Sequence, residues 1–233
     1  MLAVLLSDYP FANSINMPTD TIQPIPKDAL VIVDVQNDFL PEGKLAVRAG
    51  DEVVPVLNRY IDLFNRRSLP IYATRDWHPS DHCSFKPQGG IWPPHCIAGS
   101  TGARFPAGLN LPYTATIVSK ATTPEKDAYS GFEGTDLAAQ LKSRGIERLF
   151  IGGLATDYCV LNTVIDALSH GFKVMLLLDA IRAVNLQPGD GQAAIDVMTE
   201  HGAEPLRLVN IVDGASGSYA SPYQRSNESL ISR

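Results

Sequence analysis

Two stretches of the chain, LVIVDV at 30–35 and VMLLLD at 174–179, are apolar on both faces of an extended strand. Such runs are typical of parallel strands that are covered by helices on both sides. Short apolar runs of this kind lie at 29–35, 70–74, 115–118, 148–152, 173–178 and 206–212. Segments with helical spacing lie between them, at 51–67, 135–145, 156–171 and 191–200. The alternation predicts an α/β fold in three layers, with a six-stranded, mostly parallel sheet and helices on both faces.

The alternation is continuous, so the 233 residues predict a single domain over 28–213. Residues 1–27 contain four prolines and no sustained period, which predicts an irregular lead-in. Residues 214–233 contain six serines, which predicts a flexible tail.

Charge and apolar runs exclude several classes of protein. The formal net charge is -6, from 19 Lys and Arg against 25 Asp and Glu, which argues against a nucleic-acid partner. The N-terminal apolar run at 2–6 is too short for a signal peptide, and no run approaches the ~20 apolar residues that span a bilayer. We therefore expect a cytoplasmic protein with no membrane partner. The three cysteines form no C-x-x-C pair, so at least one free thiol is expected.

Polar side chains stand where four of the predicted strands end, and active sites of such sheets lie at that edge. Asp34 is embedded in apolar residues, so burial should raise its pKa and make it a proton acceptor. Cys159 stands at the start of a predicted helix, where the helix dipole should favour thiolate. Lys120 would stabilise the negative charges of the Asp34 carboxylate and the Cys159 thiolate. Each residue also has an ordinary structural interpretation, but their convergence favours acyl transfer through a thioester.

A second group consists of Asp76, His78 and His95, which suits zinc, iron or manganese. The alternative is a surface histidine near an acid. Cys96 and His82 are weaker ligand candidates. The aromatic residues Phe39, Trp92 and Tyr129 flank these motifs and are candidates for lining a pocket that takes a flat ligand, or for ordinary core positions.

Six motifs occur in order: DVQNDFLPEG, TRDWHPSDHCSF, WPPHC, SKAT, AYSGFEGTDL and GLATDYCV. Together they resemble the nicotinamidase/pyrazinamidase family of the isochorismatase-like (cysteine hydrolase) superfamily, over most of the chain. The resemblance implies a Rossmann-like parallel sheet of six strands. It also implies hydrolysis of nicotinamide to nicotinate and ammonia, and of pyrazinamide to pyrazinoate, in NAD salvage. The expected partner is thus a small neutral amide; the resemblance leaves homo-oligomer formation open.

The resemblance also implies roles for individual residues. Asp34 matches the catalytic acid and base, Lys120 the catalytic lysine and Cys159 the nucleophile. It implies a cis peptide between Leu154 and Ala155, with the N–H groups of Ala155 and Cys159 as the oxyanion hole. The expected substrate contacts are Phe39, Trp92, Tyr129 and Leu154. The expected ligands of one divalent metal ion, zinc before iron or manganese, are Asp76, His78 and His95, with Ser84 as a further candidate.

Other functions stay open at this point. One is an amidase of the same superfamily that acts on a different small amide; isochorismatases do not need the cysteine, and carbamoyl amidases lack the metal set. Another is a binding protein of this fold that a metal stabilises, or an inactive relative.

Overall fold

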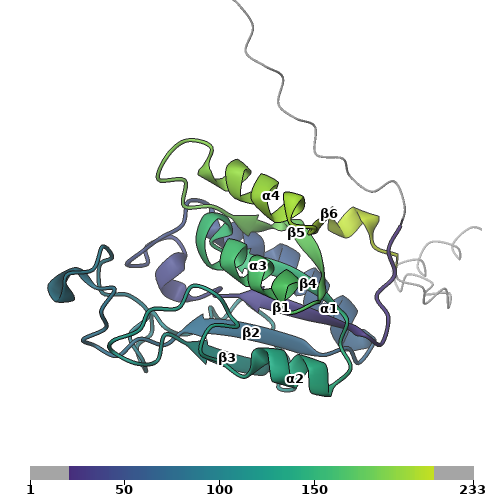
Figure 1. The fold of residues 1–233 in the computed structure, drawn as a ribbon, viewed down its shortest axis with the longest axis horizontal. Coiled ribbons are helices and arrows are strands. Elements are labelled where there is room, and N and C mark those ends of the chain that lie inside the picture. The colour runs from purple at the N-terminus through teal and green to yellow at the C-terminus, as the bar shows by residue number, and fades with distance from the viewer. Residues whose placement is uncertain (1–20, 213–233) are drawn as a thin grey trace, which may run out of the picture.

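The computed structural model describes residues 21–212, so the predicted tail and most of the predicted lead-in lie outside the described residues. Six strands form one sheet in the order β3-β2-β1-β4-β5-β6, as Figure 1 shows. Every neighbouring pair is parallel, which confirms the predicted α/β class. The strands are β1 (Asp28–Val33), β2 (Ile71–Asp76), β3 (Thr116–Lys120), β4 (Arg148–Leu154), β5 (Lys173–Arg182) and β6 (Glu204–Leu206).

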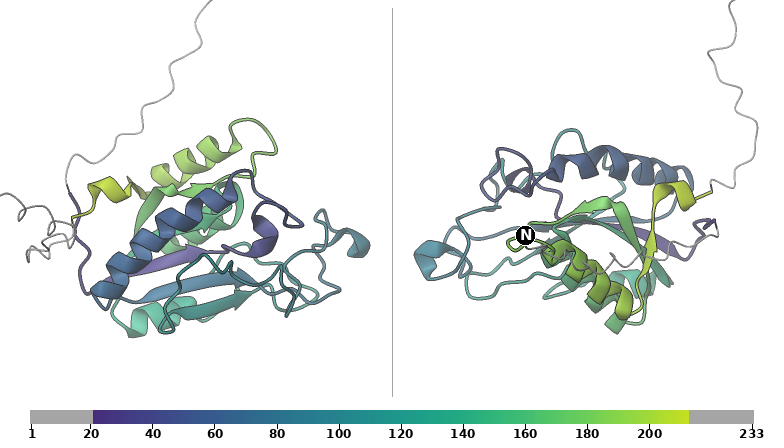
Figure 2. Two further views of the ribbon diagram at one scale, coloured as in Figure 1. Left: turned by 180° about the vertical axis from the view of Figure 1, so that it is seen from behind. Right: turned by 90° about the horizontal axis from the view of Figure 1, so that it is seen from above.

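Helices cover both faces of the sheet, and Figure 2 shows them on opposite sides. They are α1 (Val53–Arg66), α2 (Leu137–Ser143), α3 (Leu161–Ser169) and α4 (Asp190–Glu200). Alternate residues of β1 serve the two layers: Leu30 and Ile32 pack with α1, whereas Ala29, Val31 and Val33 pack with the other three helices. Among the described residues, no helix combines the length and the apolar character that a membrane crossing requires.

The last predicted strand was placed wrongly. The sequence LRLVNIV predicts a strand at 206–212, but β6 spans Glu204–Leu206 and a 3-10 turn follows at Leu208–Asn210. In that turn the Asn210 side chain accepts a hydrogen bond from the N–H of Arg207 at 3.3 Å. The predicted lead-in also contains one regular contact, because Ile22 forms a parallel bridge with Ile211.

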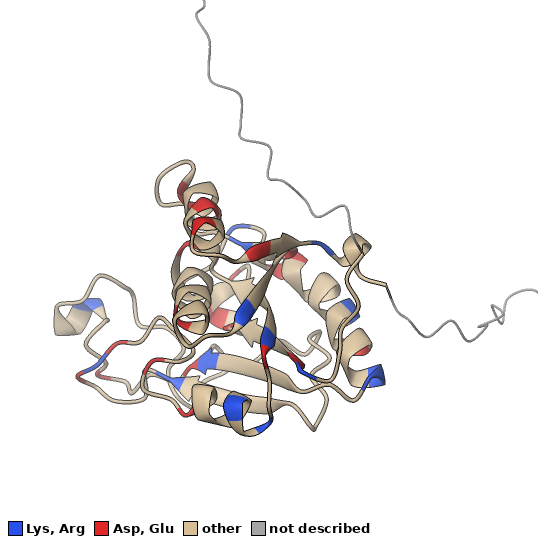
Figure 3. Ribbon diagram, turned by 45° about the vertical axis from the view of Figure 1, so that its right-hand side comes forward, with Lys and Arg blue, Asp and Glu red and all other residues tan. Residues whose placement is uncertain are grey.

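Charged residues of both signs are interspersed along the ribbon in the view of Figure 3. The connection from β2 to β3, over 77–115, is long and carries mainly turns and short bridges. In Figure 1 this connection extends beyond the strand ends at one side of the molecule. It brings His78, Trp92 and His95 toward the edge of the sheet where the predicted site lies.

Gly153, near the end of β4, lies against β1. A Cβ at 153 would lie 2.1 Å from the Val33 carbonyl oxygen. Its φ of 131° is also outside the range that side chains favour. Gly153 therefore allows β4 to pair closely with β1 directly before the turn that carries Cys159.

Replacing Gly153 with Ala should destabilise the fold by about 2–4 kcal/mol, because it adds a clash to an unfavourable φ. Urea unfolding measures the change. Gly145→Ala is the matched control: φ is 67°, but nothing lies within 4 Å of the added Cβ. It should cost only about 1–2 kcal/mol. Equal losses in the two variants would show that the contact with Val33 is unimportant.

Candidate active site

Four neighbouring strands place one polar side chain each at the same edge of the sheet. Asp34 follows β1, Asp76 and Lys120 are the last residues of β2 and β3, and Cys159 follows β4. Asp76 and Lys120 are direct partners in the parallel register. The predicted convergence at the carboxyl ends of the strands is therefore present.

Asp34 is fully buried and lies where the backbone leaves the sheet. Its φ is 47°, a left-handed conformation that Asp tolerates better than most residues. Its N–H donates to the Thr74 carbonyl oxygen at 3.3 Å, and the Thr74 hydroxyl donates to Asp34 Oδ1 at 2.6 Å. Oδ2 pairs with Lys120 Nζ at 2.9 Å. Burial raises the pKa of Asp34 more than the charge of Lys120 lowers it.

Lys120 is 1% exposed and lies between two carboxylates. Its Nζ is 2.9 Å from Asp34 Oδ2 and 2.5 Å from Asp76 Oδ1, and donates to the Ala128 carbonyl oxygen at 2.9 Å. Burial alone would lower its pKa, but Asp34 and Asp76 together raise it well above the ordinary value. The two carboxylates therefore favour the charged form of Lys120, which is buried and not solvated.

Cys159 lies beside this pair, with Sγ 3.5 Å from Lys120 Nζ. A helix was predicted from residue 156 or 157, but Thr156–Val160 form a π-helical turn and α3 begins only at Leu161. Burial raises the pKa of Cys159, and the nearby carboxylates add to this although Lys120 opposes it. The sequence favoured a thiolate at this position, whereas burial of Cys159 favours the neutral thiol. A neutral thiol that needs a base follows from this geometry.

The three predicted metal ligands also meet. Donor atoms of Asp76, His78 and His95 lie within 4.8 Å of one another, and all three residues are buried. Nδ1 of His78 is 3.0 Å from the carbonyl oxygen of His95, and Nδ1 of His95 is 2.8 Å from that of Pro93. Each ring therefore donates its Nδ1–H to a main-chain oxygen and keeps the Nε2 lone pair free to bind, as metal-binding histidines do.

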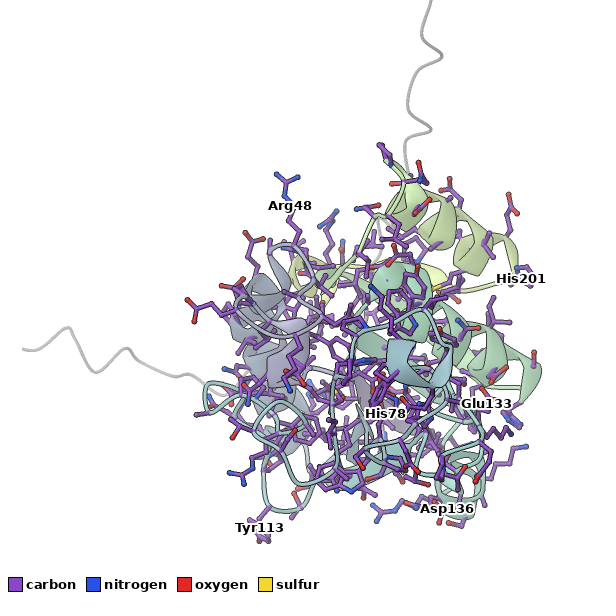
Figure 4. All side chains as sticks on the ribbon, turned by 90° about the vertical axis from the view of Figure 1, so that its left-hand side faces the viewer. Arg48, His78, Tyr113, Glu133, Asp136 and His201 are labelled. Atoms are coloured by element: carbon purple, nitrogen blue, oxygen red, sulfur yellow. The ribbon has the colours of Figure 1, made fainter. Side chains whose placement is uncertain are left out.

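Burial lowers the pKa of His78 to about 3, with the neighbouring His95 adding to the effect, so its ring is neutral at pH 7. Figure 4 shows His78 among densely packed side chains, while Tyr113 and Arg48 project from the surface. One carboxylate and two imidazoles in a buried site fit a divalent transition metal such as zinc.

The weaker ligand candidates bond to other groups. Nδ1 of His82 is 2.8 Å from Ser84 Oγ, and its Nε2 is 3.1 Å from the Lys126 carbonyl oxygen. The ring is thus held by the protein on both sides, although its donor atoms also lie near those of His78 and Asp127. Cys96 is buried, and its N–H donates to Asp38 at 2.7 Å. Burial raises the pKa of the Cys96 thiol far above its ordinary value.

A partly open cavity lies against these groups. Asp76, His95 and Cys159 contribute to its lining, which is otherwise mainly apolar. All three predicted aromatic residues, Phe39, Trp92 and Tyr129, line it too. Trp92 Nε1 donates to the Tyr129 hydroxyl at 3.0 Å, which joins two separate loops. The composition of the lining suits a small, flat, neutral ligand.

Two further expectations about the pocket have different outcomes. The peptide between Leu154 and Ala155 is cis, as the resemblance implied, and Ala155 lines the cavity. Leu154 itself is fully buried in the core, and the described residues that line the cavity do not include it, so a side-chain contact with substrate is not supported.

Sequence reasoning missed four lining residues, which are Leu45, Val47, Tyr158 and Val184. Tyr158 could have been found from its position beside Cys159. Val184 is placed by Asp157, whose carboxylate accepts the N–H groups of Val184 and Asn185 at 2.9 and 2.8 Å. No local pattern marks such a long-range contact.

Known proteins resemble the chain in sequence and in structure. Nicotinamidase of Escherichia coli (strain K12) is 40% identical over 207 residues, covering 80% of this chain and 97% of that protein. The zinc complex of pyrazinamidase from Pyrococcus horikoshii has a TM-score of 0.76 and 48% identity, covering 78% of this chain and 100% of that one. The complex of PnC1 from L. infantum with nicotinate has a TM-score of 0.77 and 36% identity, covering 82% and 98%.

The family comparison agrees with these similarities. Residues 28–208 match the model of the isochorismatase domain, which is most of the chain. That span contains Asp34, Asp76, Lys120 and Cys159. It also contains His78 and His95 of the β2–β3 connection. The chain therefore belongs to the isochorismatase family.

Proposed function

We propose that this chain is a nicotinamidase, a metal-dependent cysteine amidohydrolase that converts nicotinamide to nicotinate and ammonia and also accepts pyrazinamide. The observation that carries the proposal is the contact of Cys159 and Asp34 with Lys120, beside an apolar cavity that also reaches Asp76 and His95. The relatives named as nicotinamidase and pyrazinamidase support the choice of substrate.

Proton transfer is the first step of the proposed mechanism. Asp34 accepts the proton of the Cys159 thiol as sulfur attacks the carboxamide carbon, which forms a C–S bond. The directions of the pKa shifts support this transfer: burial makes Asp34 a stronger base than an ordinary aspartate. Lys120 stays charged and compensates the negative charge that moves from carboxylate to sulfur and on to the substrate oxygen.

The tetrahedral intermediate then collapses. The N–H groups of Ala155 and Cys159 hold the oxyanion, and Asp34 returns its proton to the leaving nitrogen, so that ammonia departs and a thioester remains. Asp34 next takes a proton from water, whose oxygen attacks the thioester carbon. The C–S bond breaks, Asp34 gives the proton taken from water to sulfur, and the acid product loses its own proton to solvent as it leaves as nicotinate.

Asp76, His78 and His95 would hold the metal ion, with zinc as the first candidate. When bound, the ion supplies a Lewis acid that holds the pyridine nitrogen of the substrate and so orients its carboxamide toward Cys159. Phe39, Trp92 and Tyr129 would enclose the ring. The mainly apolar lining accounts for a small uncharged amide as substrate.

Ammonia release from nicotinamide by the purified full chain tests the proposal. We expect turnover of nicotinamide and pyrazinamide, with little for aliphatic amides of similar size, because these do not fill an aromatic cavity. Turnover of a different amide with none of nicotinamide would identify another amidase of the family. A protein that binds zinc and hydrolyses no amide would be a binding protein, and the proposal would fail.

Removal of the metal should abolish most of this activity. After treatment with a chelator, we expect a loss of at least about 100-fold in kcat/KM, because the substrate is no longer oriented. Zinc, manganese and iron(II) are then added back separately, and the ion that restores activity identifies the functional metal. Full activity in metal-free protein would contradict the assignment of Asp76, His78 and His95.

A further inference from the structure

The side chain of Gln36 is fully buried and uses its whole amide group in hydrogen bonds. Oε1 accepts from the N–H of Asp76 at 2.8 Å, and Nε2 donates to the carbonyl oxygen of Asp76, also at 2.8 Å. The same Nε2 donates to the carbonyl oxygen of Ala103 at 3.0 Å. One side-chain amide thus bonds to both main-chain polar groups of a single residue.

The path of the backbone explains why Asp76 needs this partner. Strands β1 and β2 pair in register up to Ile32 and Ala73, and the β1 chain then turns away at Asp34, with its φ of 47°. Trp77, the residue directly after β2, donates its N–H to the carbonyl oxygen of Lys120 at the end of β3. The N–H and C=O of Asp76 therefore face the side that β1 has left, where Gln36 replaces the missing main-chain partner.

Asp76 also belongs to two parts of the site, the ion pair with Lys120 and the proposed metal site. Its Oδ1 lies 2.5 Å from Lys120 Nζ and 4.0 Å from His78 Nε2. A small shift of the Asp76 main chain would change both separations. We propose that Gln36 is a positioning residue, whose amide fixes the Asp76 main chain and thereby sets the geometry of the metal site. The inference rests on the proposed metal ligands but not on nicotinamide as the substrate.

Zinc affinity of the full chain tests this role without any assay of turnover. Metal-free protein is titrated with zinc in competition with a chromophoric chelator, for the wild type and for Gln36→Met. Methionine fills a similar volume and makes none of the three hydrogen bonds. We expect its zinc affinity to fall by about 10- to 100-fold, as for other groups that orient a ligand. The absorption spectrum of the cobalt(II)-loaded protein should also change, because the ligand geometry is altered.

Asn58 provides the matched control. Its Nδ2 donates to the Gly108 carbonyl oxygen and its Oδ1 accepts from the Asn110 N–H, both at 2.8 Å. This amide also joins main-chain groups of the β2–β3 connection, but it contacts none of the proposed ligands. Asn58→Leu should lower the unfolding temperature and leave zinc affinity and the cobalt(II) spectrum unchanged. Gln36→Met with wild-type zinc affinity and spectrum would overturn the proposal.

A measurement on the unchanged protein covers the case in which Gln36→Met does not fold. In 15N-labelled wild type, the side-chain amide signals of Gln36 should shift as one equivalent of zinc is added, and those of Asn58 should not. Unshifted Gln36 signals would count against the proposal. If Gln36→Met loses zinc affinity and the wild type does not hydrolyse nicotinamide, the inference stands and the proposed function fails.

Discussion

Cys159→Ala should lose at least about 1,000-fold in the rate of ammonia release from nicotinamide while the protein stays folded. Cys159 places its sulfur beside Lys120 and lines the cavity, and no other cysteine among the described residues lines it, so the proposed thioester should form there. Alanine is smaller than cysteine and brings no polar atom into the buried site. Single-turnover kinetics and far-UV circular dichroism measure the two parts of the prediction.

Cys83→Ala is the control for this experiment. Cys83 is a free, half-buried thiol in the connection that carries the proposed ligands, and it does not line the cavity. Its replacement should leave turnover close to the wild-type rate. A Cys159→Ala protein that released ammonia at that rate would show that Cys159 is not the nucleophile.

The sheet could be predicted from the sequence because β1 and β5 carry unbroken apolar runs, and few other structures bury both faces of a strand. The site could be predicted because polar residues in such runs must lie at strand ends. Asp34 and Lys120 were found at strand ends and Cys159 at the start of the helix that follows another strand, and their convergence required only a parallel sheet.

Other features depend on contacts that no local pattern contains. The apolar residues after Leu206 are equally compatible with a strand and with the 3-10 turn that the structure forms at Leu208–Asn210. The pKa of Cys159 is raised mainly by burial in the whole fold, which the local sequence does not reveal. The roles of Gln36 and Asp157 arise from backbone groups distant in sequence, so neither residue stands out before the fold is known.

Lys120→Met should abolish turnover and also destabilise the protein, by about 3–5 kcal/mol. The variant removes the charge between Asp34 and Asp76 and leaves two buried carboxyl groups next to each other. Without Lys120, which lowers the pKa of Asp34, that pKa should rise further above its ordinary range. Any residual turnover should therefore need a higher pH than in the wild type, since Asp34 must be unprotonated to accept the thiol proton.

The sign of the pH dependence of stability follows from the same shift. A carboxyl group whose pKa is higher in the folded protein than in the unfolded chain stabilises the fold at pH values below its pKa in the unfolded chain. This contribution is lost as the pH rises through the pKa that the group has in the folded protein. The stability deficit of Lys120→Met should thus be larger at pH 8 than at pH 5 when measured by urea unfolding. Lys27→Met, which breaks an exposed pair with Glu147, should cost less than about 1 kcal/mol at either pH. A deficit independent of pH would mean that Lys120 contributes packing and hydrogen bonds, and that its charge does not control the carboxyl groups on which the proposed mechanism depends.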